Sequence, residues 1–116
     1  MKRIEIGDLL DGSYNIDLIT YDDISYLAIW KDSNSNLYVR QILEFESENS
    51  RFDTVSYTPI TAELYTHFIS RQVCVRSLMK MSKSIITHEM RDNNPDIIFE
   101  IRMLSEEELP TFDIRT

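Results

Sequence analysis

The sequence predicts an α+β protein with an antiparallel sheet, and three observations support this fold class. β-rich runs fill the first half of the chain, two short helical patterns follow, and β-rich runs return near the C-terminus. Strands and helices are therefore segregated, and 116 residues leave no room for repeated strand–helix–strand crossovers. The predicted arrangement is an N-terminal meander and a C-terminal hairpin with two short helices between them. We expect residues 1–104 to form one domain and residues 105–116 to form an acidic C-terminal tail.

The meander is expected to begin with a β-rich run at residues 16–21. Residues 25–31 are apolar on both faces, which is typical of a central strand that is covered on both sides, or half-covered by another layer. Residues 37–45 alternate between apolar and mixed positions, which indicates an antiparallel strand with one solvent-exposed face. The Asp, Asn and Ser residues at 32–36 favour a turn, so residues 24–45 predict a hairpin.

Two short helices are predicted after the meander. A polar loop at residues 46–51 and a strand at residues 52–58 come first, and Pro59 is expected to end that strand. Thr61 is a suitable N-cap for a helix over residues 61–70. A second helix over residues 74–82 would place three apolar side chains on one face, namely Val75, Leu78 and Met79.

The C-terminal hairpin is predicted from two β-rich runs that flank a turn. The first run covers residues 84–90 and the second covers residues 96–104. The turn between them is the segment Asp92-Asn93-Asn94-Pro95. The acidic segment from Ser105 to Pro110 follows, and we expect it to be loose or packed as a short turn.

Four segments stand out in chain order: Asn34-Ser35-Asn36-Leu37-Tyr38, Ile60-Thr61-Ala62-Glu63-Leu64, Val73-Cys74-Val75-Arg76-Ser77-Leu78-Met79 and Ser105-Glu106-Glu107-Glu108-Leu109-Pro110. Together they resemble a family of small uncharacterised bacterial domains that carries no assigned activity. The resemblance covers most of residues 14–110. Members of that family carry glycines where Arg71-Gln72 and Ser82-Lys83-Ser84 stand here. The resemblance strengthens the predicted fold, and its motifs are structural rather than catalytic.

The composition argues against several classes of function. A net charge of −8 disfavours binding to nucleic acids or to anionic membranes, because both rely on basic side chains. One cysteine excludes an internal disulfide framework, and two glycines exclude a glycine-rich nucleotide loop. The N-terminal residues lack the apolar stretch of a secretory signal, and no apolar run is long enough to span a membrane. We therefore expect a soluble cytoplasmic protein.

Candidate metal ligands and nucleophiles are few. His67, His88 and Cys74 match no metal-binding spacing, and the sequence brings neither histidine next to the thiol. Cys74 is best interpreted as a small buried hydrophobic residue. The many acidic residues make chance pairs inevitable, and we interpret them as turn and surface residues. The sequence therefore predicts no catalytic residue, no metal and no cofactor.

Aromatic residues in the β-rich half are the first candidates for binding a partner protein. Tyr26, Trp30 and Tyr38 lie in the predicted hairpin, and aromatic side chains dominate the binding energy of many interfaces. The alternative is that the same side chains form core beneath the helices.

A basic stripe is the second candidate. Arg76, Lys80 and Lys83 are spaced so that they would line one side of the second helix, provided that this helix reaches residue 83. Such a stripe could contact an acidic partner, or the acidic N-terminal half of a second copy. The alternative is a solvated helix face near a C-terminus, where cations are favourable.

These features lead to one hypothesis and two alternatives. The hypothesis is a non-catalytic interaction module of a bacterium or phage that neutralises or inhibits a basic effector protein, in the manner of an antitoxin or immunity protein. The first alternative is a structural homo-oligomer, for example a homodimer in which an exposed edge strand pairs across a two-fold axis. The second is a small enzyme whose site is assembled from residues that are distant in the sequence.

Overall fold

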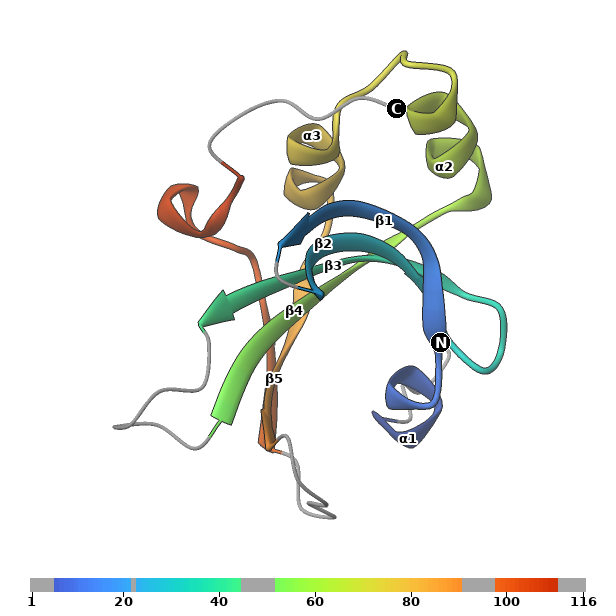
Figure 1. The fold of residues 1–116 in the computed structure, drawn as a ribbon. Helices are drawn as coiled ribbons and strands as arrows, with labels where there is room; N and C mark the ends of the chain where they lie inside the picture. Colours follow the sequence, from blue (N-terminus) through green and yellow to red (C-terminus); the bar gives the residue numbers. More distant parts are fainter. Residues whose placement is uncertain (1–5, 22, 45–51, 91–97, 111–116) are drawn as a thin grey trace.

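The computed structural model describes residues 6–21, 23–44, 52–90 and 98–110 of the chain. Its main element is one six-stranded antiparallel sheet in which each strand pairs with its neighbour in the sequence (Figure 1). The strands are β1 (Ser13–Tyr21), β2 (Ile24–Lys31), β3 (Leu37–Glu44), β4 (Phe52–Ile60), β5 (Ser84–Met90) and β6 (Ile98–Arg102). The predicted α+β class with an antiparallel sheet is confirmed. Because β5 pairs with both β4 and β6, the two C-terminal strands continue the same sheet.

Short helices lie on both sides of the sheet. The helices α2 (Ala62–Ile69) and α3 (Val75–Lys80) lie above one face, and α1 (Ile6–Leu10) lies beneath the other (Figure 1). A 3₁₀ helix, η1 (Glu106–Glu108), follows β6. As predicted, Thr61 caps α2, with its side-chain oxygen accepting from the Leu64 amide at 3.1 Å. We call the sheet face under α2 and α3 the helical face, and the face that packs on α1 the aromatic face.

The sheet has a core on each face. On the helical face, Leu27, Ile29 and Val39 pack with the four buried residues of α2 and α3, namely Phe68, Val75, Leu78 and Met79. On the aromatic face, Leu9 of α1 packs against five residues of the sheet: Trp30, Tyr38, Val55, Tyr57 and Ile85. Strand β2 is therefore covered on both sides, which is the first of the two arrangements that its continuous apolar pattern predicts.

Asp32 organises the turn between β2 and β3. One carboxylate oxygen accepts from the Asn34 and Asn36 amides at 2.9 and 2.8 Å, and the other accepts from the Tyr38 hydroxyl at 3.1 Å. Burial raises the pKa of the Asp32 carboxyl, but these hydrogen bonds outweigh burial and hold the pKa below its usual value. Burial, together with the nearby Asp32 charge, raises the pKa of Tyr38 to about 12. A buried carboxylate thus closes the hairpin that the polar turn sequence predicts.

Several predicted boundaries are wrong. Strand β1 begins at Ser13 rather than at residue 16, and β6 ends at Arg102 rather than at residue 104. Pro59 does not end β4, which continues to Ile60, with Pro59 opposite Tyr38 of β3. The proline is tolerated because β4 pairs with β5 only as far as Tyr57, so no ladder bond on that side needs its missing N–H. The helix predicted over residues 74–82 is shorter, because α3 ends at Lys80.

Other predictions lie partly outside the described residues. The loop at 46–51, the turn at 92–95 and residues 111–116 of the acidic tail are not described. Residues 105–110, which the sequence predicts to be part of that tail, contribute Leu109 to the core of the helical face. Within the described residues, no helix combines the length and apolar character needed to cross a membrane.

Candidate protein-binding groove

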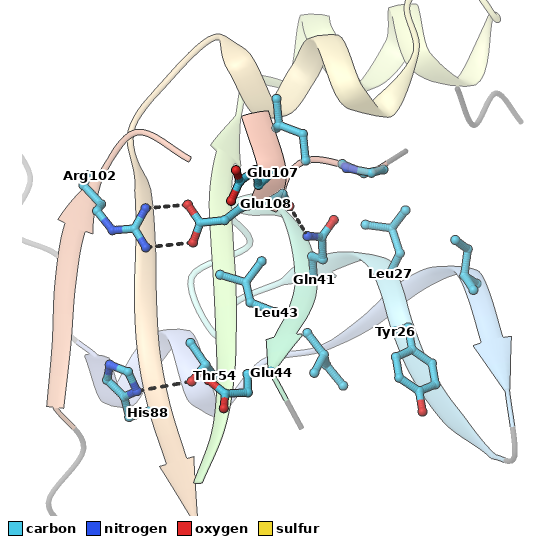
Figure 2. A pocket seen from close by; sticks show the side chains of 14 residues that line it. Tyr26, Leu27, Gln41, Leu43, Glu44, Thr54, His88, Arg102, Glu107 and Glu108 are labelled. Carbon is cyan, nitrogen blue, oxygen red and sulfur yellow. Dashed lines mark hydrogen bonds and ion pairs between the residues drawn. The ribbon is translucent and has the colours of Figure 1, made fainter. Parts of the chain in front are cut away.

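A groove of about 540 Å³ opens between η1 and the helical face of the sheet (Figure 2). Its lining comes from the strands of the sheet and from the η1 segment. The lining residues are Ile19, Tyr26, Leu27, Gln41, Ile42, Leu43, Glu44, Thr54, His88, Arg102, Glu107, Glu108, Leu109 and Pro110. Its volume lies within the range of ordinary small-molecule sites, roughly 300–1,000 Å³.

The floor of the groove is apolar. Side chains alternate along a strand, so the β2–β3 register brings Leu27 opposite Gln41 and leaves Leu43 on the same face. Leu109 comes from the segment after η1 and is only 4% exposed. Leu27 and Leu109 are core residues, and Leu43 and Ile19 are partly buried against that core. The floor of the groove is therefore formed by the edge of the hydrophobic core rather than by an isolated apolar patch.

The position of η1 is set by charged hydrogen bonds. Arg102 donates from both terminal nitrogens to the two carboxylate oxygens of Glu108, at 2.7 and 2.8 Å. The Ser105 amide also donates to Glu108, in a capping box, and the Gln41 amide donates to the Glu108 carbonyl at 2.5 Å. The Arg102 hydrogen bonds, despite some burial, lower the pKa of Glu108 to about 2, and the same contacts raise the pKa of Arg102.

Acid should weaken this attachment of η1. The Glu108 pKa falls from 4.5 to about 2 on folding, so its stabilising effect is full above pH 4.5 and is lost as pH falls towards 2. We expect Glu108→Gln to lower the free energy of unfolding at pH 6 by about 1–2 kcal/mol, less than the pKa change alone implies because solvent screens the exposed Arg102. Urea unfolding at several pH values measures this loss.

Glu107→Gln is the matched control, because among the described residues Glu107 makes no ion pair. The wild type and Glu108→Gln should converge as pH approaches 2, whereas Glu107→Gln should follow the wild type throughout. Parallel pH profiles for the wild type and Glu108→Gln would contradict the assigned role of the Arg102–Glu108 pair.

The predicted basic stripe binds the chain's own η1. Arg76 pairs with the Glu106 carboxylate, and Lys80 pairs with the same group at 3.1 Å. Arg76 also donates to the Pro110 carbonyl at 2.5 Å. Lys83 does not share the stripe, because α3 ends before it and the residue lies exposed ahead of β5. The hydrogen bond and charge of Lys80 lower the pKa of Glu106.

The rim of the groove carries two carboxylates without a partner among the described residues. Glu107 projects from η1, and Glu44 stands at the end of β3. A register shift after Ile42 places Glu44 opposite Thr54, which is hydrogen-bonded to His88 at 3.3 Å (Figure 2). Strict alternation would aim Glu44 at the aromatic face, so the bulge redirects it to the groove. With Arg102 neutralised by Glu108 and Glu100, the charge left on the rim is negative.

The two histidines and the cysteine lie on different elements of the fold. The described residues contain no group of three or more His, Cys, Asp or Glu residues that could hold a metal ion. Cys74 is 8% exposed at the start of α3, and its sulfur lies 3.3 Å from the Ser77 hydroxyl. His67 belongs to α2 and His88 to β5, and only His88 lines the groove. The arrangement suits binding of an apolar side chain next to a cation.

Two of the three predicted aromatic contacts require correction. Trp30 and Tyr38 are 8% and 5% exposed, because α1 covers them. The Trp30 ring N–H donates to the Leu9 carbonyl at 2.8 Å. Their side chains belong to the core of the aromatic face and present little surface to a partner. Tyr26 is partly exposed and lines the groove.

The aromatic face has its own smaller hollow of about 360 Å³. Tyr14 and Arg40 line it, together with Asp17 and Asp23. The Arg40 guanidinium lies 5.3 Å from the centre of the Tyr14 ring and 5.4 Å from that of Trp30. Three carboxylates, from Asp17, Asp23 and Asp53, line the hollow beside this cation, so charge does not separate the two sites. The groove on the helical face is the stronger candidate because it is larger and its floor is the edge of the hydrophobic core.

Sequence reasoning missed most residues of the groove, but one signal pointed to it. Ser105 and Glu108 have the spacing of a capping box, followed directly by the apolar Leu109. That pattern predicts an ordered turn with an anchored leucine instead of a loose tail. Comparisons with protein-family models, with curated proteins and with solved structures found no match for this chain, so the resemblance to the bacterial family stays a prediction.

Proposed function

We propose that the chain is a non-catalytic protein-interaction module of a bacterium or phage that binds a basic partner protein through the groove. Its role would be to neutralise or inhibit that partner, an effector protein, in the cytoplasm. The observation that carries the proposal is the composition of the groove. An apolar floor of core leucines lies beneath two carboxylates, Glu44 and Glu107, that have no partner among the described residues.

Each part of the groove matches one part of a partner segment. A leucine-sized side chain placed on Leu27, Leu43 and Leu109 would leave water, which contributes about 1.5–3 kcal/mol. A lysine or arginine beside it would lie between Glu44 and Glu107. Because Glu44 and Glu107 are both exposed, such charge pairs would contribute to specificity and to the association rate more than to affinity.

The charge of the whole chain supports the same kind of partner. A net charge of −8 attracts a basic protein over long distances and raises its association rate, especially at low ionic strength. The basic residues of α3 do not oppose this attraction at the groove, since Arg76 and Lys80 are paired with Glu106. The small size of the chain, its acidity and its acidic groove together favour a role as a neutralising protein over a role as an enzyme.

Selection from a random peptide library tests the proposal before any partner has been identified. The wild type serves as bait, and the double variant Glu44→Lys/Glu107→Lys serves for counter-selection. The matched control is Asp11→Lys/Glu63→Lys, which makes the same change of net charge at two exposed positions outside the groove. Circular dichroism of all three proteins verifies that the fold is retained.

We expect the selected peptides to combine lysine or arginine with a neighbouring apolar residue. They should bind the wild type and the control variant comparably, and should bind the groove variant at least tenfold more weakly. Peptides without basic enrichment, or peptides that bind the groove variant as tightly as the wild type, would show that the groove does not recognise a basic partner.

A further inference from the structure

The outer edge of β6 has a sequence that is complementary to itself. We propose that this edge pairs with β6 of a second copy of the chain, antiparallel and centred on Ile101, to give a homodimer with a continuous sheet. The proposal is independent of the proposed groove function. It rests on the regularity of the edge, on its exposed apolar residues and on the order of its charges.

The two edges of the sheet differ in regularity. Strand β1, at one edge, shows three register shifts against β2, which disturb its ladder and discourage pairing with another chain. Strand β6, at the other edge, pairs with β5 over five residues without any shift. Among the described residues no strand covers the outer side of β6. The regular edge is therefore the one that could accept a further strand.

Large apolar side chains are exposed along this edge. Phe99, Ile101 and Met103 are 42%, 49% and 47% exposed, and they alternate with Glu100 and Arg102. Phe99 and Ile101 lie opposite Thr87 and Ile85 of β5, both buried, so the apolar surface of the aromatic face continues outward onto β6. Half-exposed residues of this size next to a buried strand are expected where another element packs.

Among the registers centred on Glu100, Ile101 and Arg102, the one centred on Ile101 places no like charges opposite each other. With Ile101 opposite Ile101 of the second copy, Glu100 lies opposite Arg102, and Phe99 lies opposite Met103, the residue that follows the end of β6. Two opposite-charge pairs then flank the axis on one face, in addition to the ion pairs that Arg102 already makes within its own chain, and three apolar pairs lie on the other. A register centred on Glu100 would place two carboxylates face to face, and one centred on Arg102 would place two guanidiniums face to face.

The pairing should be weak and dependent on concentration. Strand β6 has five residues, so the area that it can bury is small compared with the roughly 1,600 Å² of a standard interface. We expect the wild type to behave as one chain when dilute and to approach the mass of two chains at high concentration. Ile101→Lys should keep the mass of one chain, whereas Met81→Lys, at a 54% exposed position beyond α3, should behave as the wild type.

Cysteine cross-linking tests the register directly. Directly opposed residues in an antiparallel pair have Cα atoms about 4.5–5.5 Å apart, which a disulfide can bridge. Ile101→Cys should therefore form a disulfide-linked dimer under mild oxidation. Phe99→Cys should not, because its copies would be displaced by four residues, or about 13 Å along the strand. A mixture of Phe99→Cys and Met103→Cys should cross-link where neither variant does alone.

The wild type is the control, since its one thiol, Cys74, is buried. Failure of Ile101→Cys to cross-link at concentrations where mass measurements show a dimer would overturn the proposal. Cross-linking through Glu100→Cys in its place would overturn it too, because the charges would then be mismatched. A mass of one chain at all concentrations would have the same consequence. None of these results depends on peptide binding, because Ile101 does not line the groove.

Discussion

Gly12→Ala should lower the free energy of unfolding by about 3 kcal/mol, at the upper end of what overpacking normally costs. A Cβ atom at residue 12 would lie 2.2 Å from the Lys31 carbonyl oxygen and 2.6 Å from the ring nitrogen of Trp30. The Lys31 oxygen belongs to the backbone of β2 and cannot rotate away. The Trp30 ring is itself held by its hydrogen bond to Leu9. The methyl group would therefore force α1 away from the aromatic face.

The second glycine of the chain provides the control. A Cβ atom at Gly7, within α1, would meet no atom within 4 Å. Gly7→Ala should keep the wild-type stability or raise it by about 0.5 kcal/mol, because alanine favours a helix. Chemical denaturation monitored by Trp30 fluorescence compares the two variants. Equal stability of Gly12→Ala and the wild type would mean that α1 does not pack against the end of β2 as described.

Asp32→Ala should be comparably damaging, with a loss of about 3 kcal/mol. Removal of the carboxylate leaves the Tyr38 hydroxyl, which belongs to a 5% exposed residue, without its acceptor. The two turn amides of Asn34 and Asn36 lose their acceptor as well. Hydrogen bonds to a charged group contribute about 1.5–3 kcal/mol each, and exposed amides recover part of that from water. Urea unfolding at pH 7 gives the loss.

Two further variants separate the hydrogen bonds from the volume of the side chain. Asp32→Asn keeps the size and one acceptor, so it should lose less than Asp32→Ala. Because the pKa of Asp32 is lowered on folding, the stabilising effect of its charge is present at neutral pH and is lost in acid. The free energies of unfolding of the wild type and of Asp32→Asn should therefore converge as pH falls. Asp11→Ala, at an exposed position, should leave stability unchanged. A similar small loss in all three variants would contradict the role of Asp32.

Local patterns were sufficient to predict the elements whose structure depends on their own residues. The alternation of residues 37–45 and the polar turn before them predict the β2–β3 hairpin, and Thr61 predicts the start of α2. The five residues of α1 have no comparable signal, because so short a helix forms only through packing on the sheet. Pro59 shows the same dependence, since its place in a strand depends on where β5 stops pairing.

The faces of a strand can be predicted more readily than what covers them. Alternation places Trp30 and Tyr38 on one face, but only the fold shows that α1 buries them there. The groove depends on contacts between residues that are still further apart in the sequence. Glu44 reaches its rim through a bulge, and Leu109 reaches its floor through the contact of Glu108 with Arg102. A single sequence does not show which distant side chains will pair, or where a bulge will interrupt the alternation of a strand.

The most direct test of the groove as the binding site is an NMR titration of the wild type with a selected basic peptide, observed through its leucine methyl groups. The proposed function predicts the largest shift changes at Leu27, Leu43 and Leu109, which form the floor of the groove. Leu9, buried on the aromatic face, should change little. Shift changes centred on Leu9 and on the Tyr14–Arg40 hollow, with the groove leucines unaffected, would contradict the proposed binding site.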